Sequence, residues 1–220
     1  MQTLTEKLIE AGWAGRVVTQ AQLARLLEGT AQRRHSLVNR ALRHGELLRL
    51  RRGLCLLAPR RQVKPPHPFV LAQALQPGSY ISFESALSFH GWIPESVPVT
   101  LSVPPGRRRL EVNHPVLGLY RFYPLALRQG HSLEAVDRHI FAGQTALVAQ
   151  PLRALLDTAC LRKLEVAEMK TLAESMRIDA EMLAQVEPAA WQILQRVYSH
   201  KRMRAGIQSL QQEMGVCMTG

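Results

Sequence analysis

The stretch that decides the N-terminal fold is residues 30–59, which reads TAQRRHSLVNRALRHGELLRLRRGLCLLAP. Its first half has the spacing of a helix that begins after Thr30 as N-cap and runs roughly to His44, where Gly45 ends it. The inward face of this helix is expected to consist of Leu37, Val38, Ala41 and Leu42. In the second half arginines alternate with leucines, which predicts two strands at about 47–51 and 54–58 that turn around Arg52-Gly53.

Two more helices are expected upstream of this stretch. Leu4, Leu8 and Trp13 recur at helical spacing, and Thr19 is a suitable N-cap for a second helix that buries Leu23. Three helices followed by a β-hairpin are the layout of a winged helix-turn-helix. We therefore predict a winged helix-turn-helix domain over residues 1–60.

Most of the positive charge of the chain lies in this same part. The whole chain has a formal net charge of +11. Residues 1–64 contain 13 lysines and arginines and 4 acidic residues, a net charge of +9, whereas residues 65–220 contain 15 and 13, a net charge of +2. Such an asymmetry indicates a polyanion-binding module joined to a more neutral domain. Nucleic acid is the commonest large polyanion, and contacts to its phosphates supply most of the affinity.

A proline-rich linker is predicted at residues 61–68, since the ten residues from Pro59 to Pro68 include four prolines. The following domain, 69–220, mixes helical and strand patterns. Helices are expected at 69–75, at 84–90 and from Pro151 to about Met214, with breaks near Ile178 and Pro188; strands are expected at 99–103, 116–123 and 146–149. The predicted fold class is α+β: a winged helix-turn-helix domain followed by a mixed α+β domain with a helical C-terminus.

Composition argues against several classes of protein. With 46% hydrophobic residues the chain can bury real cores, so global disorder is not expected. No apolar run approaches the roughly 18 residues of a membrane span, and no signal peptide is visible, so we expect a cytoplasmic protein. The three cysteines, Cys55, Cys160 and Cys217, lie far apart, and the histidines lack metal-site spacing, so we predict neither a metal nor a cofactor.

The predicted helix over 31–44 carries residue types that suit a DNA major groove, because arginine pairs with guanine and glutamine or asparagine with adenine. No acidic residue lies between Glu28 and Glu46, whereas an ordinary solvated face would mix signs. The N-terminal part of such a helix usually meets base edges. We therefore assign base contacts to Gln32, Arg33, Ser36 and Arg40. Phosphate contacts are assigned to Arg34, Asn39 and Arg43 on the helix and to Arg49, Arg51 and Arg52 on the wing.

Two other sets of residues raise the question of catalysis. Ser85 and His90 lie near Glu84, but a nucleophile also needs an oriented base and an oxyanion site, and the G-x-S-x-G pattern is absent. Asp157, Glu168 and Lys170 resemble the acidic and basic residues of metal-dependent nucleases, although their surroundings are helical. We predict no catalytic residue and keep a DNA-targeted nuclease as a minor alternative. A winged-helix transcription factor whose second domain binds a small ligand is another alternative, and a cavity with convergent polar groups there would favour it. RNA binding is a third alternative, because charge does not distinguish RNA from DNA, although no stacked-aromatic motif supports it.

Two stretches of the chain together resemble the AbiEi family of bacterial antitoxins. The first is the end of the basic module, Gly45-x-Leu-x-Arg-Leu-x-Arg-Gly-Leu-Cys55, and the second is YISFESALSFHGW at residues 80–92. In order and arrangement the resemblance covers most of the chain, and it is moderately specific.

The resemblance implies two roles. The N-terminal domain would bind inverted repeats in its own promoter and repress a type IV toxin–antitoxin operon, with DNA contacts at Arg33, Arg34, Arg40 and the wing arginines. The C-terminal domain would counter a nucleotidyltransferase-like toxin, with or without touching it. Arg107, Arg108 and Arg109, expected on a hairpin turn, are a candidate second basic patch.

Overall fold

The computed structural model of the chain describes residues 3–58 and 65–213 and has a mixed α+β architecture, as predicted. The chain divides into two compact units, Met1–Leu75 with Ile140–Gln144 and Gln76–His139 with Thr145–Gly220. Residues 59–64, which begin the predicted proline-rich stretch, lie outside the described part. None of the described helices is long and apolar enough to cross a membrane.

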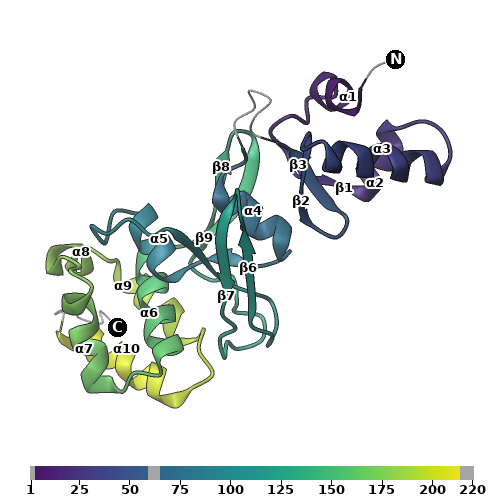
Figure 1. Ribbon diagram of the computed structural model, residues 1–220. Coiled ribbons are helices and arrows are strands. Elements are labelled where there is room, and N and C mark those ends of the chain that lie inside the picture. The colour runs from purple at the N-terminus through teal and green to yellow at the C-terminus, as the bar shows by residue number, and fades with distance from the viewer. Residues whose placement is uncertain (1–2, 59–64, 214–220) are drawn as a thin grey trace. The chain divides into compact units, whose positions relative to one another are not determined.

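The first unit places three helices beside a small antiparallel sheet (Figure 1). The strands pair in the order β1-β3-β2. In chain order the elements are α1 (Leu4–Glu10), β1 (Val18–Thr19), α2 (Gln20–Leu26), α3 (Ala31–Arg43), β2 (Leu47–Arg51) and β3 (Leu54–Leu57). The predicted strands at 47–51 and 54–58 are thus confirmed, and Gly53, with φ at +81°, makes the turn between them.

Threonine caps fix where two of these helices begin, as predicted. The Thr19 hydroxyl accepts a hydrogen bond from the Gln22 N–H at 3.2 Å, and the Thr30 hydroxyl accepts one from the Arg33 N–H at 3.3 Å. Ala41 is buried, and Val38 and Leu42 pack against the same core. That core joins all three helices to the sheet through Leu4, Leu8, Val18, Leu23, Leu27, Leu47, Cys55 and Leu57.

A further helix, α4 (Pro68–Leu75), groups with the first unit, and so does the turn at 140–144. The predicted boundary at residue 69 therefore differs from the division in the structure. The physical reason is a cluster of rings: His67 stacks on Phe141 with centroids 4.0 Å apart, and Phe69 meets the same ring edge-on at 5.8 Å. The Gln144 side-chain amide also donates to the Gly15 carbonyl at 2.8 Å.

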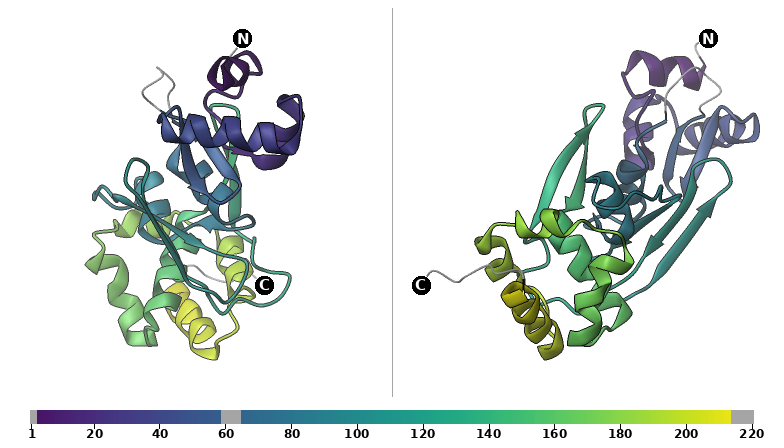
Figure 2. Two further views of the ribbon diagram at one scale, coloured as in Figure 1. Left: turned by 45° about the vertical axis from the view of Figure 1, so that its right-hand side comes forward. Right: turned by 90° about the vertical axis from the view of Figure 1, so that its left-hand side faces the viewer.

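The second unit is built on a mixed sheet with strand order β6-β7-β5-β4-β9-β8. Its strands are β4 (Tyr80–Ile81), β5 (Val99–Val103), β6 (Leu110–His114), β7 (Gly118–Phe122), β8 (Val136–Phe141) and β9 (Gln144–Ala149). Figure 2 shows β6 and β7 as a long hairpin. The helices are α5 (Phe83–Phe89), α6 (Pro151–Arg162), α7 (Val166–Ser175), α8 (Ala180–Ala184), α9 (Pro188–Gln195) and α10 (Lys201–Glu213).

Several elements of this unit were not predicted: strands β4, β6 and β8, and the break between α9 and α10. The hairpin placement of Arg107–Arg109 is wrong, because β5 runs parallel to β7 and β6 pairs with the far side of β7. The arginine run therefore lies on a connection that passes from β5 over to β6 across one strand.

Candidate nucleic-acid interface

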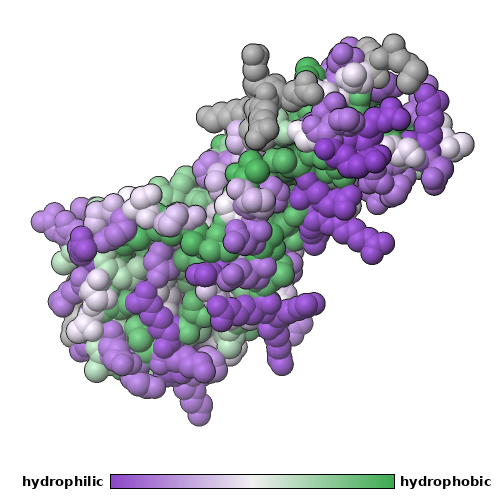
Figure 3. Space-filling view, in the orientation of Figure 1, coloured by the Kyte–Doolittle hydropathy of each residue, from purple (hydrophilic) through white to green (hydrophobic). Residues whose placement is uncertain are grey.

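One face of α3 is exposed and strongly basic. The cap at Thr30 and the buried Ala41 set the rotation of the helix, so that the predicted contact residues Gln32, Arg33, Ser36, Arg40 and Arg43 are all exposed. Figure 3 shows hydrophilic residues gathered around α2, α3 and the β2–β3 turn of the first unit. The structure thus brings these five predicted side chains together on a single surface.

The arginines of this surface lack a neutralising partner among the described residues. Among the described residues, none of Arg33, Arg40 and Arg43 forms an ion pair, although ion pairs do occur elsewhere, as between Arg162 and Glu84 at 2.8 Å. The nearest acid after the helix, Glu46, accepts a hydrogen bond from the Thr5 hydroxyl at 2.8 Å and so faces α1. The positive charge of α3 is therefore available to an outside anion.

Two of the predicted phosphate-binding residues also tie α3 to the neighbouring strand. The Asn39 side-chain oxygen accepts a hydrogen bond from the Arg49 guanidinium on β2 at 3.5 Å, and the Asn39 amide lies 3.1 Å from the His35 ring. A shallow groove runs here between α3 and β2, with Arg43 and Leu48 also on its walls. Asn39 and Arg49 therefore form a surface link between the helix and the hairpin.

The turn before α3 is held by arginines of the helix itself. The Arg34 guanidinium donates to the Gly29 carbonyl, which leaves Arg34 half-buried. A Cβ atom at Gly29 would lie 3.1 Å from Cδ of Arg33, so the stem of Arg33 rests against this turn. The two arginines thus play different roles: Arg34 bonds to the backbone of the turn, and the stem of Arg33 packs against it.

The β2–β3 turn carries Arg51 and Arg52, both exposed and without an ion-pair partner among the described residues. The pairing register shifts between Arg49 and Arg51, which marks an irregularity in β2 just before the turn. Burial raises the pKa of the Cys55 thiol opposite Arg49, an effect that the positive charge of Arg49 partly offsets. Cys55 is therefore a core residue and not a reactive thiol at neutral pH.

The candidate second patch lies in the other unit. Arg107, Arg108 and Arg109 are exposed, and the Arg109 guanidinium lies over the Tyr123 ring, 4.6 Å from its centroid. The same guanidinium donates to the Tyr123 hydroxyl at 3.4 Å. Arg109 is thus partly engaged, whereas Arg107 and Arg108 have no ion-pair partner in the described part of the chain.

The acid of the nuclease alternative, Asp157, is fully buried in the second unit and each of its oxygens accepts two hydrogen bonds. Oδ1 accepts from Arg153 Nε at 2.9 Å and from the Tyr198 hydroxyl at 2.8 Å. Oδ2 accepts from the Tyr80 hydroxyl at 3.0 Å and from the Ser82 hydroxyl at 2.7 Å. These four donors leave the carboxylate no free direction for an outside ligand.

Glu168, the second acid of the nuclease alternative, has a structural role too. Glu168 is exposed in the first turn of α7, where its carboxylate accepts the Glu165 N–H at 2.7 Å as part of a capping box. Within residues 3–58 and 65–213 no group of three or more His, Cys, Asp or Glu side chains is arranged to hold a metal ion.

Arg153 is the charged centre of the buried network, which sequence reasoning missed. Its guanidinium also donates to the Glu134 carbonyl at 2.7 Å and to the Tyr80 hydroxyl at 2.5 Å. Burial opposes its charge, but Asp157 and the two tyrosines outweigh burial and raise the pKa of Arg153. Burial, and next the charge of Asp157, raise the pKa of Tyr80 and Tyr198 well above the ordinary value, so both hydroxyls stay protonated as donors.

Ser85 and His90 do not form a catalytic pair. The Ser85 hydroxyl donates to the Val99 carbonyl at 2.8 Å and accepts from the Leu101 N–H at 2.9 Å, which joins α5 to β5. His90 Nε2 lies 3.0 Å from the Ala149 carbonyl. The polar residues of the segment 80–92 therefore serve mainly to hold the second unit together.

Comparison with known proteins gives a likeness to solved structures alone. No family model matches the chain, and no curated protein matches it. Among solved structures, the RV2827C protein from Mycobacterium tuberculosis is similar over 100% of this chain and 84% of that chain, with 17% sequence identity and a TM-score of 0.48. A similarity of this degree carries no argument about function.

Proposed function

We propose that the first unit is a winged helix-turn-helix domain that binds double-stranded DNA, with α3 in the major groove and the β2–β3 turn as the wing. The order of helices and strands supports this proposal. The observation that carries it is the exposed face of α3, where Arg33, Arg40 and Arg43 have no ion-pair partner in the described chain. Such a surface leaves uncompensated charge that phosphates neutralise.

The proposed DNA-contact residues fall into three groups according to where they lie in the first unit. Gln32, Arg33, Ser36 and Arg40 are the base-reading residues. The first three lie on the exposed face towards the start of α3, and Arg40 lies on the same face in the last turn. Arg43, Arg51 and Arg52 neutralise phosphates on either side. Arg34, Asn39 and Arg49 contribute mainly by setting the geometry, since their side chains already bond within the unit.

At the level of the whole protein we infer a cytoplasmic transcriptional repressor that acts as the antitoxin of a type IV toxin–antitoxin operon. This inference is supported by the resemblance of residues 45–55 and 80–92 to the AbiEi family. Two copies would bind symmetric half-sites of the promoter. The second unit would counter a nucleotidyltransferase-like toxin, and no single residue is assigned to that role.

The decisive experiment is fluorescence anisotropy of the full chain on the DNA upstream of its own gene and on a scrambled duplex, across a salt series. Tighter binding to the upstream DNA, with affinity that falls steeply as salt rises, is expected of an autorepressor. Equal binding to both duplexes would reject sequence-specific repression.

A matched pair of variants locates the phosphate contacts. Arg51→Ala is expected to weaken binding to both duplexes alike and to reduce the salt slope by about one. Arg162→Ala removes the same charge, but from an arginine that Glu84 already neutralises, and is expected to change neither quantity. Equal effects of the two substitutions would mean that only net charge matters and that the wing makes no contact.

The antitoxin role needs its own test. Expression of the chain together with the toxin encoded beside it is expected to restore growth. Growth that stays blocked while promoter binding is intact would leave a repressor without antitoxin activity.

A further inference from the structure

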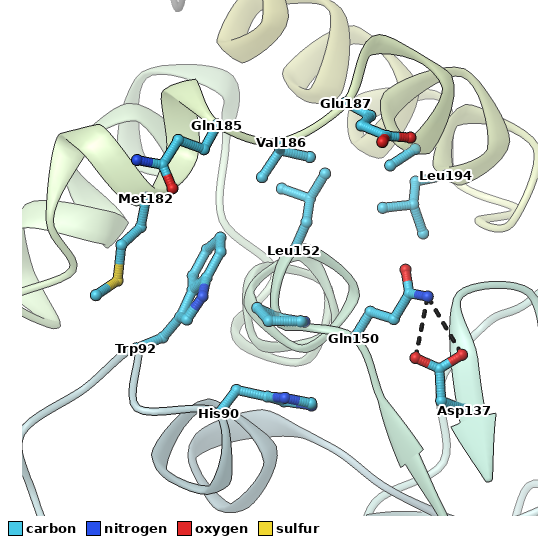
Figure 4. Close-up of a pocket in the computed structure, with 12 residues that line it drawn as sticks. His90, Trp92, Asp137, Gln150, Leu152, Met182, Gln185, Val186, Glu187 and Leu194 are labelled. Atoms are coloured by element: carbon cyan, nitrogen blue, oxygen red, sulfur yellow. Dashed lines mark hydrogen bonds between the residues drawn. The ribbon is translucent and has the colours of Figure 1, made fainter.

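The second unit contains a cavity of about 660 Å³ that the proposed DNA binding does not use. It lies where α6 begins and where α8 leads into α9, with the end of α5 and strand β8 completing its walls (Figure 4). Its volume falls within the range of about 300–1,000 Å³ that is typical of small-molecule sites. All residues that line it belong to the second unit.

One end of the cavity is apolar and flat. The Trp92 indole forms a side wall, and Met182 lies beside it on α8 (Figure 4). Leu152 and Leu194, 4% and 0% exposed, belong to the core behind the cavity. A half-buried indole beside a methionine offers a surface on which an aromatic ring stacks favourably.

The other end is rich in hydrogen-bond acceptors. The Gln150 amide donates to both Asp137 oxygens, at 3.3 and 3.1 Å, and this bond leaves the Gln150 side-chain oxygen as an acceptor at the cavity. Figure 4 shows the Glu187 carboxylate on the same side as Gln150, opposite Trp92. Because a carbonyl oxygen only accepts, His90 Nε2 donates to Ala149, and the neutral ring presents Nδ1 as one more acceptor.

The charge of this end is negative. Neither lysine nor arginine is among the described residues that line the cavity, although the chain as a whole has a net charge of +11. The N-termini of α6 and α9 meet here and each adds about half a positive charge. The carboxylates of Asp137 and Glu187 carry two full negative charges, so the balance is about one negative charge.

We propose that this cavity binds a small organic cation, an amine joined by a short chain to a flat aromatic ring. The ring stacks on Trp92, and the ammonium group donates hydrogen bonds to Glu187 and to the Gln150 side-chain oxygen. This site goes beyond the proposed DNA binding and does not depend on it.

The direct test is isothermal titration calorimetry of the full chain with tryptamine and with indole-3-acetate, which share a ring and differ in the sign of the side-chain charge. Tryptamine is expected to bind one molecule per chain, and indole-3-acetate to give no measurable heat of binding. Equal binding of both compounds, or no binding of tryptamine, would overturn the proposal.

Substitutions of two nearby glutamates separate the cavity from general surface charge. Glu187→Gln is expected to weaken tryptamine binding about tenfold or more, because it removes one charge-assisted hydrogen bond. Glu181→Gln changes the net charge equally at an exposed position of α8 that does not line the cavity, and is expected to leave binding unchanged. Equal losses in the two variants would show that tryptamine binds through surface charge alone.

Two further measurements complete the test. Trp92→Leu is expected to abolish the preference for tryptamine over an aliphatic amine of similar length, and retention of that preference would exclude stacking on Trp92. Anisotropy on the upstream DNA is expected to be unchanged in ligand-free Glu187→Gln. This control keeps a failure of the cavity proposal distinct from a failure of the DNA-binding proposal.

Discussion

Arginine is used in opposite ways in the two units of this protein. On α3 the guanidinium groups of Arg33, Arg40 and Arg43 have no acidic partner among the described residues. On α6 the guanidinium of Arg153 is fully buried and bonds to Asp157, Tyr80 and two carbonyl groups. The partners of a charged side chain, and not its residue type, therefore decide whether it stabilises the fold or is available to an outside molecule.

The largest expected effect comes from breaking the buried network. Asp157→Asn removes the carboxylate and leaves the Arg153 charge in the interior, which is expected to lower the free energy of unfolding by about 3–5 kcal/mol. Urea denaturation followed by circular dichroism measures this loss. Glu84→Gln breaks the exposed ion pair with Arg162 and is the matched control, with an expected change of about 0–1 kcal/mol. Similar losses in the two variants would mean that burial of the network adds nothing.

The second effect concerns an exposed arginine, whose loss is expected to weaken DNA binding and to leave stability unchanged. Arg40→Ala is expected to weaken binding to the upstream DNA by about 1–3 kcal/mol and to relax base preference, because Arg40 lies on the face of α3 that we propose to read bases. Its free energy of unfolding is expected to stay within about 0.5 kcal/mol of the wild type, since the side chain is exposed. Anisotropy and urea denaturation on one preparation measure both quantities. If the substitution lowers the affinity for the upstream duplex and for the scrambled duplex equally, Arg40 does not read bases.

The first unit could be predicted from sequence because its signals are local. Thr19 and Thr30 lie next to the helices that they cap, and the alternation of leucine and arginine marks β2 within a few residues. The basic face of α3 follows from the same helical period. The contact between α3 and β2 could not be predicted, because Asn39 and Arg49 lie on two elements whose packing sequence alone does not show.

The second unit could be predicted only in part because its pairing is long-range. Strand β4 lies between β5 and β9, with Ile81 opposite Val148, and no local pattern encodes that partner. The buried network did leave a signal: Arg153 and Asp157 lie four residues apart in a helix whose other residues are mostly apolar. An isolated pair of opposite charges at this spacing in an apolar helix indicates a buried pair, and this pattern marks Asp157 as the partner of Arg153 and not as a nuclease acid.

A third effect tests whether the contact between Arg33 and the turn at Gly29 matters for DNA binding. Gly29 and Gly45 flank α3, and both have positive φ, +97° and +65°. Alanine at either position is expected to destabilise the fold by about 1–2 kcal/mol. Only at Gly29 would the new Cβ touch Arg33, because at Gly45 nothing lies within 4 Å. Gly29→Ala is therefore expected to reduce specific DNA binding as well, and Gly45→Ala to leave it unchanged after correction for the folded fraction. Equal effects on binding would show that the position of Arg33 against Gly29 does not matter.

The smallest expected effect belongs to His90. Its side chain is half-buried, between the exposed arginines of α3 and the fully buried Arg153. Burial lowers the pKa of His90 below its ordinary value of 6.5, and the charge of His139 lowers it further, while the hydrogen bond to Ala149 and the charge of Asp137 raise it. The unfolded chain therefore takes up the proton at a higher pH than the folded chain. The contribution of the neutral His90 ring to the free energy of unfolding is fully present above about pH 6.5. It is lost as the pH falls through the folded-state pKa.

His90→Gln removes this proton uptake and keeps a side chain that can donate to the Ala149 carbonyl. The melting temperature of the wild type is expected to fall more than that of His90→Gln between about pH 7.5 and about pH 5.5. His44→Gln changes an exposed histidine and is expected to behave like the wild type. Calorimetric melting curves at both pH values measure the difference. If His90→Gln loses as much stability on acidification as the wild type does, His90 is not the group whose burial opposes protonation, and the pH dependence of the second unit must come from other side chains.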